Sequence, residues 1–134
     1  MTRKPEANFY QKVKKGMTKA KITRVESWVN LGIPDCIVAL GGAFHLVELK
    51  VADNKGKVKV SPHQVAFHSS HKDYPVWLFV QYDKGRKARL MVYPAWKSYD
   101  VAKFGILAQP ALEQLYPWDW KKVEDFLQKA LDNV

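Results

Sequence analysis

Cysteine, acidic residues and long apolar runs are all scarce in this sequence, and each shortage excludes a class of protein. The 134 residues include one cysteine, Cys36, so internal disulfides are excluded and a reducing compartment such as the cytoplasm is expected. No run approaches the roughly 18 apolar residues of a membrane-spanning helix. The first residues (MTRKPEANFY) lack the apolar core of a signal peptide. We therefore expect a cytoplasmic protein without a membrane partner.

The deficit of acidic residues leaves the chain strongly basic. Asp and Glu number 13 against 22 Lys and Arg, which gives a formal charge of +9 at pH 7. This balance favours polyanionic partners, of which nucleic acid is the commonest and an anionic membrane surface the next. The length and apolar content predict one globular domain over residues 1–134.

Apolar periodicity and turn residues predict an α/β fold of the α+β type, in which helices flank a mixed sheet. Helices are expected over residues 6–16, 62–71 and 119–133, and strands over 21–26, 36–40, 43–51, 75–83 and 88–93. Gly41-Gly42 predicts a tight hairpin turn between the second and third strands. Ser61-Pro62-His63-Gln64 predicts a helix start, with Ser61 as N-cap and Gln64 as the second arm of a capping box.

The predicted hairpin places two carboxylates face to face. If Leu40 pairs with Ala43, Asp35 lies opposite Glu48, and Lys50 shares their face because strand side chains alternate. The rest of that face is expected to be an apolar floor of Ile37, Ala39, Phe44 and Leu46. Opposed like charges are destabilising, and a hard divalent cation would offset the repulsion. The alternative is a solvated sheet edge at which Lys50 screens both acids.

These residues resemble a known nuclease signature. Pro34-Asp35, a spacer of twelve residues and Glu48-Leu49-Lys50 match the PD-(D/E)xK pattern. Together with Arg24-Val25-Glu26, Gly32-Ile33-Pro34-Asp35 and Ser61-Pro62-His63-Gln64, they resemble the VRR-NUC-like and phage-type Holliday junction resolvase branch of that superfamily. The resemblance covers roughly residues 22–70, with a looser match through 75–82. It implies a restriction-endonuclease-like core.

The resemblance also implies a role for each site residue. Asp35, Glu48 and the backbone carbonyl of Leu49 would bind Mg²⁺, and Mn²⁺ would also support activity. Lys50 would orient or deprotonate the attacking water and stabilise charge on the phosphate. Gln64 would position that water or a phosphate oxygen, although a capping-box glutamine needs no catalytic role. Such residue types suit phosphodiester hydrolysis.

An additional acid is expected to complete the metal site. Glu26 is favoured for both the catalytic and the metal-binding set, because it closely precedes the Gly-Ile-Pro-Asp element. Glu6 on the first helix is the alternative, since many relatives carry this acid there.

Basic residues near these motifs are expected to form a rim that binds DNA phosphates. They are Lys15, Lys21 and Arg24 before the hairpin, and Lys55, Lys57 and Lys59 in the loop before the Ser61 helix. The histidines of that helix, His63, His68 and His71, lack zinc-site spacing and are expected to be solvated. His45 is expected to pack on the sheet face away from the carboxylates.

The expected function is a divalent-metal-dependent endodeoxyribonuclease acting on branched DNA, with a Holliday junction resolvase favoured. It would work in the host cytoplasm if a phage encodes it. The alternatives are a flap- or nick-directed nuclease of the same superfamily and a non-catalytic basic DNA-binding module. A homodimer is expected, because paired nicks need two sites and residues 104–120 are rich in apolar and aromatic side chains; packing of that stretch within its own subunit is the alternative.

Overall fold

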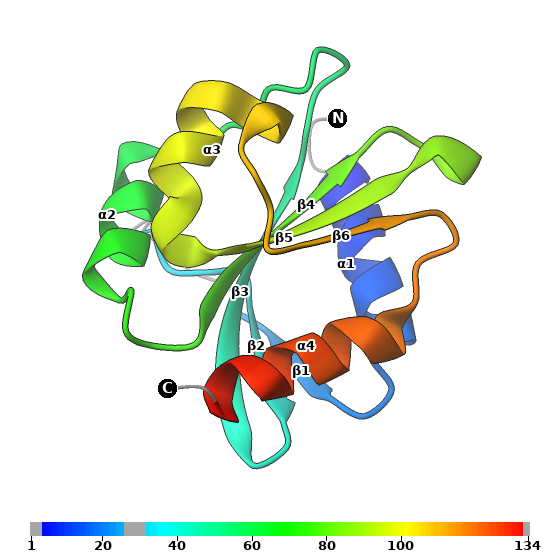
Figure 1. Cartoon of the computed structure of the whole chain (residues 1–134), viewed down its shortest axis with the longest axis vertical. Helices are drawn as coiled ribbons and strands as arrows, with labels where there is room; N and C mark the ends of the chain where they lie inside the picture. Colours follow the sequence, from blue (N-terminus) through cyan, green and yellow to red (C-terminus); the bar gives the residue numbers. More distant parts are fainter. Residues whose placement is uncertain (1–3, 26–31, 133–134) are drawn as a thin grey trace.

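A computed structural model of the chain describes residues 4–25 and 32–132, which form a mixed α+β fold around one six-stranded sheet (Figure 1). The strands lie in chain order: β1 (Lys21–Arg24), β2 (Cys36–Leu40), β3 (Ala43–Val51), β4 (Val76–Tyr82), β5 (Arg89–Pro94) and β6 (Leu112–Leu115). The helices are α1 (Lys4–Gly16), α2 (Pro62–Ser70), α3 (Ser98–Phe104) and α4 (Trp120–Asp132). Short 3-10 turns are η1 (Gly85–Lys87), η2 (Ala95–Lys97) and η3 (Gly105–Leu107).

The sheet changes direction at one place. Strands β3 and β4 pair in parallel, whereas the other four neighbouring pairs are antiparallel. The connection from β3 to β4 contains α2, as parallel pairing requires a crossover rather than a tight turn. The sheet therefore consists of antiparallel strands on either side of a single central β-α-β unit.

Two apolar clusters hold helices against the two faces of the sheet. On one face, α1 and α4 pack through Phe9, Val13 and Leu127 against strand residues such as Val47 and Phe79. On the other face, Leu78, Val80, Met91 and Tyr93 pack with Val101 of α3. Helices α2 and α3 lie together over this second face (Figure 1).

The predicted hairpin is confirmed in bounds and in register. Leu40 pairs with Ala43 and Cys36 with Val47, and both central glycines have positive φ, as a two-residue hairpin turn requires. Helix α2 begins at Pro62 with the complete capping box that the sequence predicted.

Two elements were not predicted. Strand β6 has only four residues and sits at the sheet edge, so it shows too little alternation to be recognised. Helix α3 has seven residues and buries only Ser98 and Val101, which leaves no helical apolar period in the sequence.

The expectation of an apolar floor below the carboxylates was wrong. Phe44 is 72% exposed, and Ile37, Ala39 and Leu46 are half-buried. These residues lie on β2 and on the first part of β3. The described residues include no helix long and apolar enough to cross a membrane.

Candidate active site

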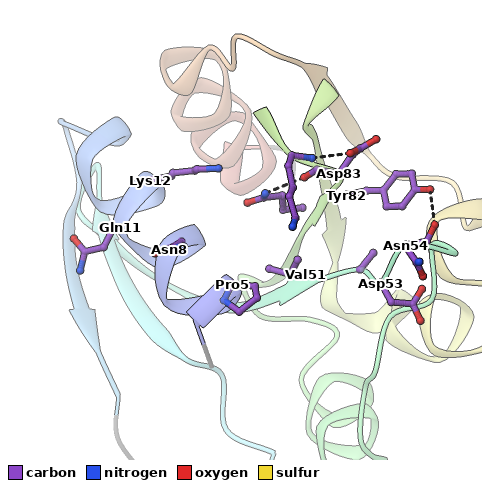
Figure 2. A pocket seen from close by; sticks show the side chains of 12 residues that line it. Pro5, Asn8, Gln11, Lys12, Val51, Asp53, Asn54, Tyr82 and Asp83 are labelled. Atoms are coloured by element: carbon purple, nitrogen blue, oxygen red, sulfur yellow. Dashed lines mark hydrogen bonds between the residues drawn. The ribbon is translucent and has the colours of Figure 1, made fainter. Parts of the chain in front are cut away.

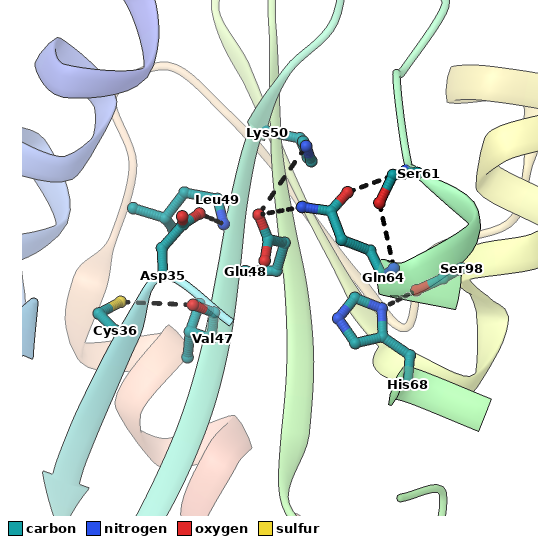
Figure 3. A network of polar contacts seen from close by, with 10 residues as sticks. All are labelled: Asp35, Cys36, Val47, Glu48, Leu49, Lys50, Ser61, Gln64, His68 and Ser98. Atoms are coloured by element: carbon teal, nitrogen blue, oxygen red, sulfur yellow. Dashed lines mark hydrogen bonds and ion pairs between the residues drawn. The ribbon is translucent and has the colours of Figure 1, made fainter. Parts of the chain in front are cut away.

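The predicted residues Asp35, Glu48, Lys50 and Gln64 lie together where β3 meets the start of α2 (Figure 3). Glu48 and Lys50 are two residues apart on β3 and point to the same face. Asp35 precedes β2 directly, and its Oδ2 accepts a hydrogen bond from Leu49 N–H at 2.8 Å. Its own carbonyl accepts from Val25 N–H at 2.7 Å. Hydrogen bonds to its carboxylate and to its backbone carbonyl thus fix Asp35 beside the last part of β3.

Glu48 is a buried acid next to a second acid. Its side chain is 2% exposed. Burial raises the pKa of Glu48 far above its ordinary value, and the charge of Asp35 and a hydrogen bond shared with that carboxyl raise it further, while Lys50 lowers it. In the ionised form Oε1 is buried without a donor among the described residues. An ionised pair here needs a cation that reaches this oxygen.

Two side chains contact the other oxygen, Oε2. Gln64 Nε2 donates to it at 3.2 Å, and Lys50 Nζ lies 3.9 Å away. Gln64 is held in turn by the capping box, because Ser61 N–H donates to its Oε1 at 2.9 Å. The same glutamine therefore caps the helix and contacts the buried acid, so the two roles considered from the sequence are compatible.

Gly32 allows the loop before Asp35 to approach α2. Its φ is +81°, and a Cβ there would lie 2.2 Å from the carbonyl oxygen of His63. A larger residue would push the Pro34-Asp35 segment away from the helix that carries Gln64.

Of the two candidate additional acids, Glu26 lies outside the described residues. Glu6 is exposed on α1, and desolvation by its neighbours raises the pKa of its carboxyl, with Lys50 lowering it and Asp35 raising it. Glu6 is therefore within electrostatic reach of the site. Within residues 4–25 and 32–132, no group of three or more His, Cys, Asp or Glu side chains is close enough to hold a metal ion.

The expectation that His68 is solvated was wrong, because His68 is fully buried. Its Nδ1 contacts the hydroxyl of Ser98, which itself donates to Ala95 O at 2.6 Å. Ser98 therefore accepts from Nδ1–H of the imidazole. Burial lowers the pKa of His68 to about 4, and the charges of Lys50 and His71 lower it too. The other expected position is confirmed: His45 is buried opposite Val38, on the face away from the carboxylates.

A groove of about 850 Å³ joins this cluster to the predicted basic loop. It is lined by Lys50 and Gln64 on one side and by the exposed Lys55, Lys57 and Lys59 on another. The remaining predicted phosphate contacts, Lys15, Lys21 and Arg24, are exposed but do not line it. Arg24 lies over the ring of Tyr10 at 5.0 Å. The loop lysines are thus the ones that the fold brings to the acids.

The third wall of this groove was not predicted. It consists of residues 102–107, from the end of α3 and from η3. A second hollow, of about 930 Å³, lies between α1 and the ends of β3 and β4 (Figure 2). It is lined by Asn8, Val51 and Gln81 among others, and by none of the four site residues, so it is separate from the cluster.

Comparisons of the chain with protein-family models, with curated proteins and with solved structures found no match in any of the three. A functional assignment therefore rests on the chemistry of the cluster and of the groove beside it.

Proposed function

We propose that the protein is a divalent-metal-dependent endodeoxyribonuclease of the PD-(D/E)xK type that acts on branched DNA. One observation carries the proposal: three separate segments bring Asp35, Glu48, Lys50 and Gln64 to one point beside a lysine-lined groove. Nothing in the packing of a strand favours a buried acid beside a second acid, since charged groups are costly to bury without a partner.

The donor set at this point suits a hard divalent cation. Glu48 presents a buried carboxylate oxygen that lacks a donor among the described residues, and Asp35 lies beside it. Carboxylate and carbonyl oxygens are the preferred ligands of Mg²⁺ and Mn²⁺. Asp35, Glu48 and the carbonyl of Leu49 would hold the ion, with Glu26 or Glu6 as an additional acid. When bound, Mg²⁺ would supply Lewis-acid polarisation of the scissile phosphate and lower the pKa of a water.

Residues of the chain would then orient the attacking water and neutralise the charge of the DNA phosphates. Lys50 is 14% exposed at the edge of the groove, where its ammonium can face a phosphate oxygen as well as Glu48. Gln64 is fixed by Ser61, so its amide can hold a water or a phosphate oxygen without rearrangement. The loop lysines would hold the phosphate backbone along the groove without reading bases.

The fold supports the same proposal. A mixed sheet flanked by helices, with the acids on a hairpin strand and the glutamine on the crossover helix, is the arrangement implied by a restriction-endonuclease-like core. Among branched-DNA nucleases we favour a junction-resolving enzyme working as a homodimer.

A cleavage assay with MgCl₂ or MnCl₂ tests the proposal. Labelled four-way junctions, flaps, nicked duplex, linear duplex and single strands are compared at equal concentration. We expect cleavage of the junction above all, none in EDTA, and binding without cleavage in CaCl₂, whose looser coordination positions a water poorly. Preferred cutting of flaps or nicks would indicate the alternative nuclease.

Two variants make the assay specific. Glu48→Gln should abolish cleavage and keep DNA binding. Glu124→Gln is the matched control, because Glu124 is an equally buried acid, 2% exposed, on α4; it should leave cleavage intact. DNA binding by the wild type without cleavage in either metal would refute the nuclease and leave a DNA-binding module.

A further inference from the structure

Two apolar side chains project beside the candidate active site. Phe104 at the end of α3 is 52% exposed, and Leu107 at the end of η3 is 86% exposed. We refer to these two residues as the apolar tip. Both line the groove that also contains Lys50 and Gln64. A ligand bound in that groove would therefore meet the apolar tip and the candidate site together.

The apolar tip is held in place by the backbone beneath it. Ile106 N–H donates to Gly56 O at 2.9 Å, which ties η3 to the loop of the three lysines. A Cβ on Gly105 would lie 2.1 Å from that same carbonyl oxygen, and one on Gly56 would lie 2.6 Å from Ile106 Cγ1. Ile106 itself packs on the apolar cluster around Met91 and Tyr93. A close-fitting junction of two loops thus holds the backbone next to Leu107.

The surroundings of the apolar tip are cationic. The exposed side chains of Lys55, Lys57, Lys59 and Lys103 line the same groove. Among its described lining residues the one acid is Asp53, and its Oδ1 is turned into its own loop, where it accepts from Lys55 N–H and Lys57 N–H. A ligand that covers this surface must combine negative charge with a flat apolar surface.

Nucleic acid with an unstacked base meets both requirements. In an intact duplex the faces of the bases are covered by stacking, so an apolar side chain reaches them only where the stack is interrupted. Proteins that kink or open DNA use Phe and Leu side chains at such steps, next to cations that bind the phosphates.

We propose that the apolar tip is a wedge that contacts the exposed base pair at a DNA branch point and so selects branched over linear DNA. This inference rests on the proposed function, since it assigns the substrate feature that the groove recognises. A second copy of the chain is the competing occupant. A twofold contact through the apolar tip would place the lysines of one subunit against the same lysines of the other, which opposes such a dimer.

Binding measurements on tip variants test the wedge. The probes are a four-way junction and a linear duplex of the same length, each with 2-aminopurine at the central base step, in CaCl₂ so that the DNA stays intact. Leu107→Ala and Phe104→Ala should each weaken junction binding by roughly tenfold, the size expected for one lost base contact. Both should leave duplex binding within about twofold. Binding of the wild type should raise the 2-aminopurine fluorescence at the branch point, because the base there becomes unstacked. Both tip variants should lose this rise.

Leu115→Ala is the matched control. Leu115 is a 68% exposed leucine on β6 that does not line the groove, so this variant should bind both DNAs as the wild type does. Because Leu107 is almost fully exposed, loss of folding cannot account for an effect of Leu107→Ala, and a far-ultraviolet spectrum checks this for Phe104→Ala.

The outcomes separate the two proposals. If the wild type cleaves junctions and both tip variants bind them as tightly as the wild type, the wedge is refuted and the nuclease stands. If the tip variants lose junction preference but no metal supports cleavage, the wedge stands and the nuclease is refuted. If Leu107→Ala turns a dimer into a monomer in sedimentation equilibrium, the apolar tip is an interface between copies and the wedge is refuted.

Discussion

Replacing Glu48 by Gln should stabilise the protein in EDTA and remove its stabilisation by Mg²⁺. The amide keeps the shape of the side chain, and its oxygen can still accept from Gln64 Nε2, which lies 3.2 Å from Oε2. Its NH₂ group replaces Oε1, the buried oxygen that has no donor among the described residues. The amide nitrogen can then donate to Asp35, as the protonated carboxyl does, without the cost of keeping an acid neutral above its ordinary pKa.

The size of the effect follows from these contacts. An unsatisfied buried polar group costs about 1–3 kcal/mol. The lost contact with Lys50 Nζ subtracts little, because 3.9 Å is at the outer limit of an ion pair. For a domain of this length 1 kcal/mol corresponds to roughly 3–5 °C in Tm. We therefore expect Glu48→Gln to raise the Tm in EDTA by about 3–15 °C.

Magnesium should stabilise the wild type and leave Glu48→Gln almost unchanged. A ligand that binds only the folded state at 100 times its Kd adds about 2.7 kcal/mol to the free energy of unfolding. The wild type should gain roughly 8–13 °C in Tm on saturation with MgCl₂, and Glu48→Gln should gain almost nothing. Thermal unfolding followed by circular dichroism, with and without MgCl₂, measures both quantities.

Glu124→Gln controls for the loss of a buried acid in general. Glu124 Oε2 accepts from Lys19 N–H at 2.9 Å, so its replacement weakens a charge-assisted bond and should lower the Tm in EDTA while the Mg²⁺ shift persists. A lower Tm of Glu48→Gln in EDTA, like that expected of Glu124→Gln, would contradict the predicted stabilisation. A Mg²⁺ shift equal to that of the wild type would contradict metal binding by Glu48.

Three further predictions concern DNA binding, acid stability and assembly. Neutralising Lys55, Lys57 and Lys59 together should reduce the slope of log K against log salt by about 2–3, since each phosphate contact contributes roughly 0.9; an unchanged slope would place DNA elsewhere. His68 is neutral when folded, with a pKa lowered to about 4. Stability should therefore be complete above pH 6.5 and decline, by up to about 3 kcal/mol, as the pH falls to 4. His68→Asn should flatten this decline in urea titrations. A mixed dimer of wild-type and Glu48→Gln subunits should nick one strand of a junction; a strict monomer that makes paired cuts would exclude the homodimer.

The hairpin and the helix cap were predictable because their signals are local. Gly41-Gly42 between two apolar runs fixes the pairing of Leu40 with Ala43, and that pairing sets every other partner along β2 and β3. Ser61 and Gln64 likewise act on each other across one helical turn. Neither inference needs to know where the rest of the chain lies.

The burial of His68 could not be predicted, because it depends on α3. Ser98 is thirty residues further along the chain, and its hydroxyl accepts from Nδ1 of the imidazole. Helix α3 itself has no periodic signal, so the sequence offers no surface against which a histidine on α2 could be buried. The apolar tip was missed for the same reason: its two residues were interpreted with the apolar stretch 104–120 as material for a dimer interface. In the fold that stretch divides, since Trp118 and Trp120 pack against the core of their own subunit while Leu107 is exposed.

The placement of charged residues within an apolar strand follows from the change of neighbours along β3. Phe44, Leu46 and Glu48 point to the same face, yet their exposure falls along the strand until Glu48 is 2% exposed. The first part of β3 pairs with β2 alone on this stretch, and its face is open. From Leu46 onward β3 also pairs in parallel with β4, and Gln64 at the start of the crossover helix α2 contacts Glu48. Glu48 is therefore buried where the β-α-β connection adds its neighbours to those of the hairpin. The same connection carries Gln64, which contacts the Glu48 carboxylate, and the three loop lysines. One crossover therefore provides both the low-dielectric surroundings of Glu48 and the cationic groove next to it.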